Sequence, residues 1–70
     1  MKISYLKLWK LLLDKKLKKT DLVGLVGIST STLSKLSKDQ PVNMEILTRI
    51  CTVLNCDISD IVEMVPYEDL

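Results

Sequence analysis

Apolar residues recur at the spacing of an α-helix in five segments of this 70-residue chain. In the fourth segment Ile50, Cys51 and Leu54 follow Leu47 at distances of three, four and seven residues, which places all four on one helix face. No segment shows the alternation typical of a half-buried strand. The pattern predicts an all-α fold with helices at about residues 4–16, 19–26, 29–37, 44–54 and 58–64, followed by a tail over residues 66–70.

Residues that commonly begin and end helices stand at the boundaries of these segments. Short polar side chains, which accept hydrogen bonds from the first N–H groups of a helix, begin four of them: Ser4, Thr20, Ser29 and Asn43. Asp57 and Asp60 are spaced as in a capping arrangement at the start of the last segment. Gly27 follows the second segment, where a left-handed residue often ends a helix. These signals indicate short helices joined by tight turns.

The composition excludes most kinds of catalytic and metal site. The chain has no histidine, which removes the most versatile acid–base group and the commonest metal ligand. Its two cysteines are too few for a four-ligand zinc site, and its two glycines are too few for a glycine-rich phosphate loop. A domain of this length buries only about 60% of the surface that its unfolded chain exposes, which leaves little material for a deep cleft. We therefore expect no enzyme activity, no cofactor, no metal site and no small-molecule ligand.

The cysteines and the apolar segments also bear on the compartment. On a continuous helix, the five-residue spacing of Cys51 and Cys56 sets their side chains apart, so we expect reduced, buried thiols that act as small apolar groups. Lys7 and Lys10 interrupt the first apolar segment, and no apolar run approaches the roughly 18 residues of a membrane span. These features predict a cytoplasmic protein with no membrane partner.

Charge is divided sharply between the two halves of the chain. Nine lysines and two aspartates give residues 1–38 a formal charge of +7, whereas one arginine and seven carboxylates give residues 39–70 a charge of −6. Such asymmetry indicates one face for a polyanion and another face that is kept away from it. The alternative is two solvated surfaces without any partner.

Residues 17–38 combine a short helix, a glycine, an apolar residue and a second helix rich in hydroxyl groups. Gly27 allows a tight turn, Ile28 is expected to lie buried beneath it, and Ser29 caps the second helix. The second helix has a narrow apolar stripe, Leu33 and Leu36, and its other side chains are short, polar or basic. This is the sequence pattern of a helix-turn-helix, in which short side chains let a helix enter a DNA major groove about 12 Å wide.

The motif Leu22-x-x-x-x-Gly27-Ile28-Ser29-x-x-x-Leu33-Ser34 resembles the lambda-repressor-like helix-turn-helix family, the Cro/XRE class of bacterial and phage regulators. The resemblance continues through Asn43-Met44-Glu45-x-Leu47 and Leu54-Asn55-Cys56-Asp57-Ile58-x-x-Ile61, and so covers roughly residues 4–65. It implies a compact five-helix DNA-binding fold, formed as a single domain over residues 1–70, with the helix-turn-helix at the second and third helices.

The resemblance also implies a set of DNA-binding residues. In the family, the residue that starts the second helix holds a phosphate, the start of the third helix faces base edges, and the residue just after that helix contacts the backbone. The matching positions in this chain are Lys19, Ser29, Thr30, Ser31, Ser34, Lys35 and Lys38. Lys35 has two possible targets, guanine O6 and N7 or a phosphate.

The chain departs from the family pattern at three places. Val23 replaces an alanine that is common after the leucine of the second helix. Leu12 and Ser37 stand where many members pair an arginine with a glutamate, and losing both partners avoids stranding a buried charge. Thr30 and Ser31 are short groups that make single contacts, so that base discrimination would be modest or would depend on water and DNA shape.

The leading interpretation is a sequence-specific transcriptional regulator that binds double-stranded DNA as a homodimer and is therefore nucleoid-associated within the cytoplasm. A second interpretation is a protein-interaction module on the same fold, antitoxin-like or anti-repressor-like, whose surface is the acidic half or the face of the first helix around Trp9. The wide apolar arc of that helix motivates this alternative. Attachment of the basic N-terminal helix to a membrane surface is the third, although the small core needs the apolar face of that helix.

Overall fold

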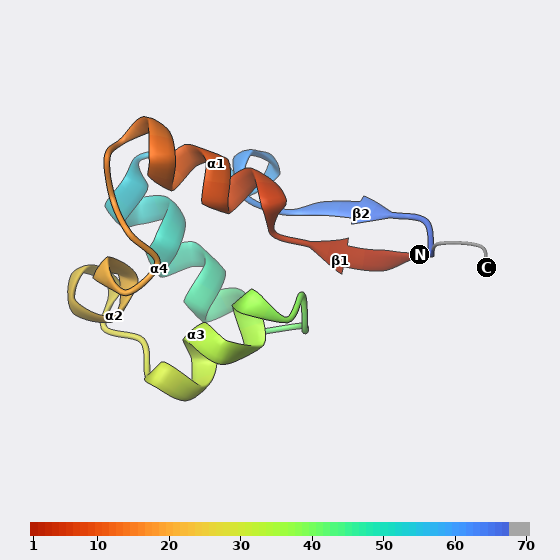
Figure 1. Cartoon of the computed structure of the whole chain (residues 1–70), viewed down its shortest axis with the longest axis horizontal. Coiled ribbons are helices and arrows are strands. Elements are labelled where there is room, and N and C mark those ends of the chain that lie inside the picture. The colour runs from red at the N-terminus through yellow and green to blue at the C-terminus, as the bar shows by residue number, and fades with distance from the viewer. Residues whose placement is uncertain (68–70) are drawn as a thin grey trace.

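The computed structural model describes residues 1–67, which form four α-helices, one short 3-10 helix and two short strands (Figure 1). In chain order the elements are β1 (Lys2–Ser4), α1 (Leu6–Asp14), α2 (Asp21–Val26), α3 (Thr30–Ser37), α4 (Met44–Leu54), the 3-10 helix η1 (Ile58–Asp60) and β2 (Glu63–Val65). The three middle helices lie within two residues of their predicted bounds. Residues 68–70 of the predicted tail lie outside the described residues.

The two ends of the chain differ from the prediction of an all-α, five-helix fold. β1 and β2 form an antiparallel ribbon in which Lys2 faces Val65, Ile3 faces Met64 and Ser4 faces Glu63. The first helix therefore begins at Leu6, and the last predicted helix, over 58–64, is only the single turn of η1. Strands of three residues are too short to show an alternation, and each has its partner at the opposite end of the chain. Figure 1 shows the ribbon projecting away from the helices.

One apolar cluster holds the helices together, and α4 runs through its middle between α1 and α3 (Figure 1). All four α-helices contribute buried residues to it, and Ile3 of β1 packs against it. Complete burial of a leucine or isoleucine side chain contributes about 1.5–3 kcal/mol, so this cluster dominates the stability of the fold. Its buried members are Tyr5, Leu8, Leu12, Leu22, Val26, Ile28, Leu36, Leu47, Ile50, Leu54 and Ile61.

Tyr5 connects the ribbon, α1 and the segment after α3. Its side chain is fully buried, and its hydroxyl donates a hydrogen bond of 2.8 Å to the carbonyl oxygen of Gln40. Its backbone N–H donates to Asp39 Oδ1 at 3.1 Å. Burial raises the pKa of the Tyr5 hydroxyl above its ordinary value of 10.0, and the nearby Asp39 carboxylate acts in the same direction. The exit of α3 is thereby fixed to the start of α1.

Two predicted helix starts outside the helix-turn-helix are confirmed. Asn43 Oδ1 accepts a hydrogen bond from the N–H of Ile46 at 2.9 Å, as an N-cap should. Asp60 Oδ2 accepts from the N–H of Asp57 at 2.9 Å, so the aspartate pair caps η1 as its spacing predicts. Both contacts satisfy N–H groups that a helix leaves without partners.

The predicted N-cap at Ser4 is wrong, and Thr20 occupies the N-cap position of α2 without capping the helix through its side chain. Thr20 already has helical backbone angles and its side chain makes no capping hydrogen bond. The first turn is instead held by Asp21, whose Oδ2 accepts from the N–H of Lys18 at 2.8 Å. Ser4 precedes the true N-cap by one residue, although its hydroxyl accepts from the N–H of Leu6 at 3.3 Å. At α2 the neighbouring Asp21 supplies the polar group, whereas at α1 the strand β1 extends to Ser4 and delays the start of the helix.

The two cysteines lie closer together than the helical spacing predicts. α4 ends at Leu54, because Asn55 has a left-handed backbone with φ +53°, and the N–H of Cys56 then bonds to the carbonyl of Cys51 at 3.0 Å. This chain reversal brings Cys56 back over Cys51. Both are free thiols and half-buried. Burial, together with the neighbouring Cys51 thiol, raises the pKa of Cys56 from 9.0 to about 11.

No helix in residues 1–67 is long and apolar enough to cross a membrane. The longest, α4, has 11 residues, whereas a span requires about 20. Across the same stretch of chain, no three His, Cys, Asp or Glu side chains are grouped so as to hold a metal ion.

Candidate nucleic-acid interface

The turn between α2 and α3 has the geometry that its sequence predicts. Gly27 ends α2 with φ +79° and ψ +33°, a left-handed conformation that favours glycine. Ile28 follows, with only 4% of its side chain exposed, and anchors the turn to the core. α3 starts after Ser29, so that three residues separate the two helices. The buried members of both helices, Leu22, Val26 and Leu36, fix them to the same core.

α3 has one buried edge and one exposed polar face. Leu36 is fully buried, and Leu33 is half-buried against the core. Four of the predicted site residues on this helix are exposed to solvent: Thr30, Ser31, Ser34 and Lys35. The exposed face therefore presents hydroxyl groups and one ammonium group, without a bulky apolar side chain.

Ser29 serves the helix itself. Its Oγ accepts a hydrogen bond from the N–H of Thr32 at 3.1 Å and donates one to Thr32 Oγ1 at 3.1 Å. The predicted N-cap role is thus confirmed. The Ser29 hydroxyl is already engaged in hydrogen bonds to Thr32 within the first turn of the helix. The N–H groups of Thr30 and Ser31 are the first two of α3. Like the first N–H groups of any helix, they have no acceptor within the helix and point out of its N-terminal end.

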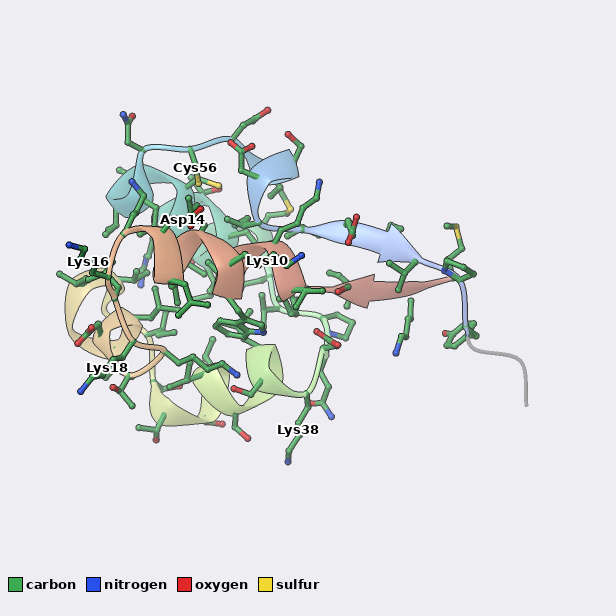
Figure 2. All side chains as sticks on the ribbon, turned by 45° about the horizontal axis from the view of Figure 1, so that its top comes forward. Lys10, Asp14, Lys16, Lys18, Lys38 and Cys56 are labelled. Carbon is green, nitrogen blue, oxygen red and sulfur yellow. The ribbon has the colours of Figure 1, made fainter. Side chains whose placement is uncertain are left out.

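The far end of α3 is closed by a second left-handed residue. Lys38 follows the helix, and Asp39 has φ +55°. The N–H of Gln40 then bonds to the carbonyl of Lys35 at 2.9 Å, which turns the chain away. Lys38 is exposed at this end (Figure 2), so that α3 has basic side chains both on its outer face and at its C-terminus. Cations at that end also suit the helix dipole.

Lysines flank the helix-turn-helix on its N-terminal side as well. Lys16 and Lys18 lie on the loop before α2 (Figure 2). Lys10 lies on α1 near Asp14, with which it lines a separate hollow, and is not part of this surface. Lys19 is exposed at the start of the first turn of α2. The one ion pair in residues 1–67 joins Glu45 to Arg49 at 3.2 Å, so none of these lysines is neutralised by a carboxylate of the described chain.

Lys7 and Leu12 do not belong to this surface. Lys7 Nζ donates to the carbonyl of Ser59 at 3.1 Å and so connects α1 to η1. Leu12 stands where many family members carry an arginine; it is only 2% exposed and belongs to the core. Ser37 stands where those members carry the glutamate that pairs with this arginine, and it is exposed. The double departure from the family pattern is therefore accommodated by apolar packing in place of an ion pair.

One contact at this surface was not predicted from the sequence. The Lys19 ammonium lies over the indole ring of Trp9, 4.3 Å from the ring centroid. Around this contact is a hollow of about 270 Å³ lined by Trp9, Leu12, Leu13, Leu17, Lys18 and Lys19. Lys19 was predicted only as a phosphate contact, and no spacing rule connects it with an aromatic residue across a loop.

Comparisons with known proteins agree with the resemblance seen in the motif. The fold is similar to the crystal structure of the transcriptional regulator VanUg, form II, with a TM-score of 0.91 and 48% sequence identity. That similarity covers 94% of this chain and 88% of the other. No curated protein sequence gives a significant match. Residues 7–67 match the model of one family, so the chain belongs to the Cro/C1-type helix-turn-helix DNA-binding domains.

Proposed function

We propose that this chain is a sequence-specific transcriptional regulator that inserts α3 into the major groove of double-stranded DNA. The observation that carries the proposal is the exposed polar face of α3 together with three exposed lysines that pair with no carboxylate of residues 1–67: Lys35 on that face, Lys38 just after the helix and Lys19 before α2. Such a face suits a groove lined by base edges and bordered by phosphates. The description of VanUg as a transcriptional regulator, at 48% identity, supports the same conclusion.

The residues of the surface divide by their chemistry. Thr30, Ser31 and Ser34 offer hydroxyl groups for single hydrogen bonds to base edges or bridging water. Lys35 reaches either a guanine or a phosphate from the same face. Lys19 and Lys38 serve as phosphate contacts at the two ends of the helix-turn-helix. Ser29 acts indirectly, because its hydroxyl is used to hold the start of α3.

Sequence discrimination by such short hydroxyl side chains depends on more than direct hydrogen bonds. A hydroxyl makes one contact where an arginine or glutamine makes two, so each contributes less to the choice between base pairs. We therefore propose that bridging water and the deformability of the DNA supply part of the specificity.

The regulator acts as a homodimer on two half-sites about one helical turn apart. A single short recognition helix makes too few contacts for tight binding, and a twofold dimer doubles them. The candidate contact region is the end of the β1–β2 ribbon, where the side chains of Met64 and Tyr67 are 55% and 67% exposed. Within residues 1–67 the ribbon has only the strands β1 and β2, so each strand has an outer edge with which no third described strand pairs.

Selection from a pool of randomised DNA duplexes tests the proposal. Binding is measured at about 50 mM and about 200 mM salt, with sedimentation of the same sample. If each protomer pairs about three lysines with phosphates, the logarithmic salt slope of a dimer is roughly −5. We expect the selection to recover a palindromic site, and we expect a dimer to bind it with a salt slope of about that size. A flat salt response would contradict the mechanism.

A triple variant separates DNA binding from a contact with another protein. Replacing Lys19, Lys35 and Lys38 by glutamine removes three positive charges from the proposed surface, and should abolish DNA binding while the fold persists. Lys10→Gln, which changes a lysine of α1 (Figure 2), is the control. Unaltered binding by the triple variant would favour the protein-interaction module.

A further inference from the structure

The Lys19 side chain is held differently from the other lysines of the surface. Its ammonium group stacks on the Trp9 ring, 4.3 Å from the centroid, whereas no carboxylate of residues 1–67 pairs with it. An aromatic face attracts a cation through its quadrupole but carries no net charge. The contact therefore fixes the position of the ammonium and leaves its full charge available to an anion. A carboxylate in the same place would have cancelled that charge.

The backbone explains how two residues ten positions apart come into contact. α1 ends at Asp14, and two residues later Lys16 has a left-handed φ of +60°. The N–H of Leu17 then bonds back to the carbonyl of Leu12 at 2.8 Å. The half-buried Leu17 packs against the core, and the loop then leads to α2 (Figure 1). Lys19 is thus returned to the Trp9 side of α1.

Both ends of Lys19 are held. Its carbonyl accepts the N–H of Leu22 at 3.1 Å in the first turn of α2, and its ammonium lies on Trp9, which is itself half-buried against the core. A free lysine side chain must give up much of its rotational freedom when it contacts a phosphate. Holding the side chain in advance lowers that cost at the moment of binding.

We propose that Trp9 is a positioning residue for DNA binding, which holds the Lys19 ammonium over the start of α2 in readiness for a backbone phosphate. The inference rests on the proposed function and adds to it a residue of α1 that lies outside the helix-turn-helix. Trp9 itself need not touch DNA, because its effect passes through Lys19. The stacking is present before DNA binds, so it is also observable in the free protein.

A double-mutant cycle on the whole chain tests this inference. The affinity for the selected duplex is measured for wild type, Trp9→Leu, Lys19→Gln and the double variant. Ordering one long side chain in advance saves about 0.5–1 kcal/mol on binding, a two- to fivefold effect on affinity for each bound protomer. Trp9→Leu should weaken wild-type binding by that factor and leave the affinity of Lys19→Gln unchanged. Lys19→Gln should also flatten the logarithmic salt slope by about 0.9 per protomer, whereas Trp9→Leu should not.

An equal loss from Trp9→Leu in both backgrounds would overturn the inference, because Trp9 would then act only through the fold. Trp9→Phe keeps a smaller aromatic face and provides a second cycle if the leucine variant does not fold. In the free wild-type protein, the ring current of Trp9 should shift the NMR signals of the Lys19 ε-methylene upfield, and an unshifted signal would also overturn the inference. If the wild type bound no duplex, the proposed function would be contradicted as well. If the wild type bound DNA but the effects of the two substitutions were additive, only this inference would be contradicted.

Discussion

The hydroxyl of Tyr5 donates a 2.8 Å hydrogen bond to the carbonyl oxygen of Gln40, and so links the start of α1 to the segment that leaves α3. Tyr5→Phe keeps the buried ring and removes this donor, which leaves a carbonyl with one partner fewer. We expect a loss of about 1–2 kcal/mol in the free energy of unfolding, or roughly 4–15 °C in Tm. Urea and thermal denaturation measure it.

Tyr67→Phe is the matched control for that prediction. Tyr67 is 67% exposed, so removal of its hydroxyl should change the free energy of unfolding by less than about 0.5 kcal/mol. Equal effects from the two substitutions would mean that the Tyr5 hydroxyl has no special role in joining α1 to the exit of α3.

The two glycines should respond in opposite ways to alanine. Gly24 lies inside α2, and a Cβ there would meet no atom within 4 Å. Gly24→Ala should therefore raise the free energy of unfolding by about 0.5–1 kcal/mol through helix propensity. Gly27 has equal space but a φ of +79°, so Gly27→Ala should lower stability by about 1–2 kcal/mol through backbone strain. Chemical denaturation of both variants checks the signs, and a stabilising Gly27→Ala would contradict this account of the turn.

The helix-turn-helix was predictable from the sequence because its determinants are local. Gly27 and Ser29 act on the backbone within three residues of themselves, and the apolar stripe of α3 is visible as a three-residue spacing. The proposed DNA contacts were assigned from the positions of the same residues along α2 and α3. Exposure in the structure agrees with Thr30, Ser31, Ser34 and Lys35 facing outward, and the DNA contacts themselves remain predictions.

The features that were not predicted all depend on distant or competing residues. β1 and β2 pair opposite ends of the chain, and three residues leave no period to detect. Thr20 was a reasonable N-cap by residue type, but the carboxylate of Asp21 reaches the N–H of Lys18 and starts the turn earlier. The Lys19–Trp9 contact arises from the chain reversal after α1, which no pairwise spacing rule describes.

The thiol of Cys56 should make stability depend on pH in the alkaline range. Burial and the neighbouring Cys51 raise its pKa from 9.0 to about 11 in the folded protein. Above pH 9 the unfolded chain loses this proton first and so binds fewer protons than the folded chain, which means that stability falls as pH rises. The stability that the protonated Cys56 thiol contributes is complete below pH 9 and is lost as the pH rises through about 11.

Cys56→Ala isolates that contribution from other groups that titrate in the same range. The stability gap between wild type and Cys56→Ala should narrow as the pH rises from 9 to 11, when unfolding is followed in urea under reducing conditions. A gap that stays constant over this range would show that the thiol has the same pKa in the folded and unfolded chains.

Lys35 provides the most direct test of the recognition surface, because it is the one basic residue on the exposed face of α3. Lys35→Gln should weaken binding to the selected duplex by about 5- to 150-fold per protomer, corresponding to about 1–3 kcal/mol, whereas Lys10→Gln should not. The pattern across duplexes identifies its target. A loss confined to one base position indicates a guanine contact, and a uniform loss with a flatter salt slope indicates a phosphate. Equal affinities for Lys35→Gln and Lys10→Gln would mean that α3 does not face the DNA.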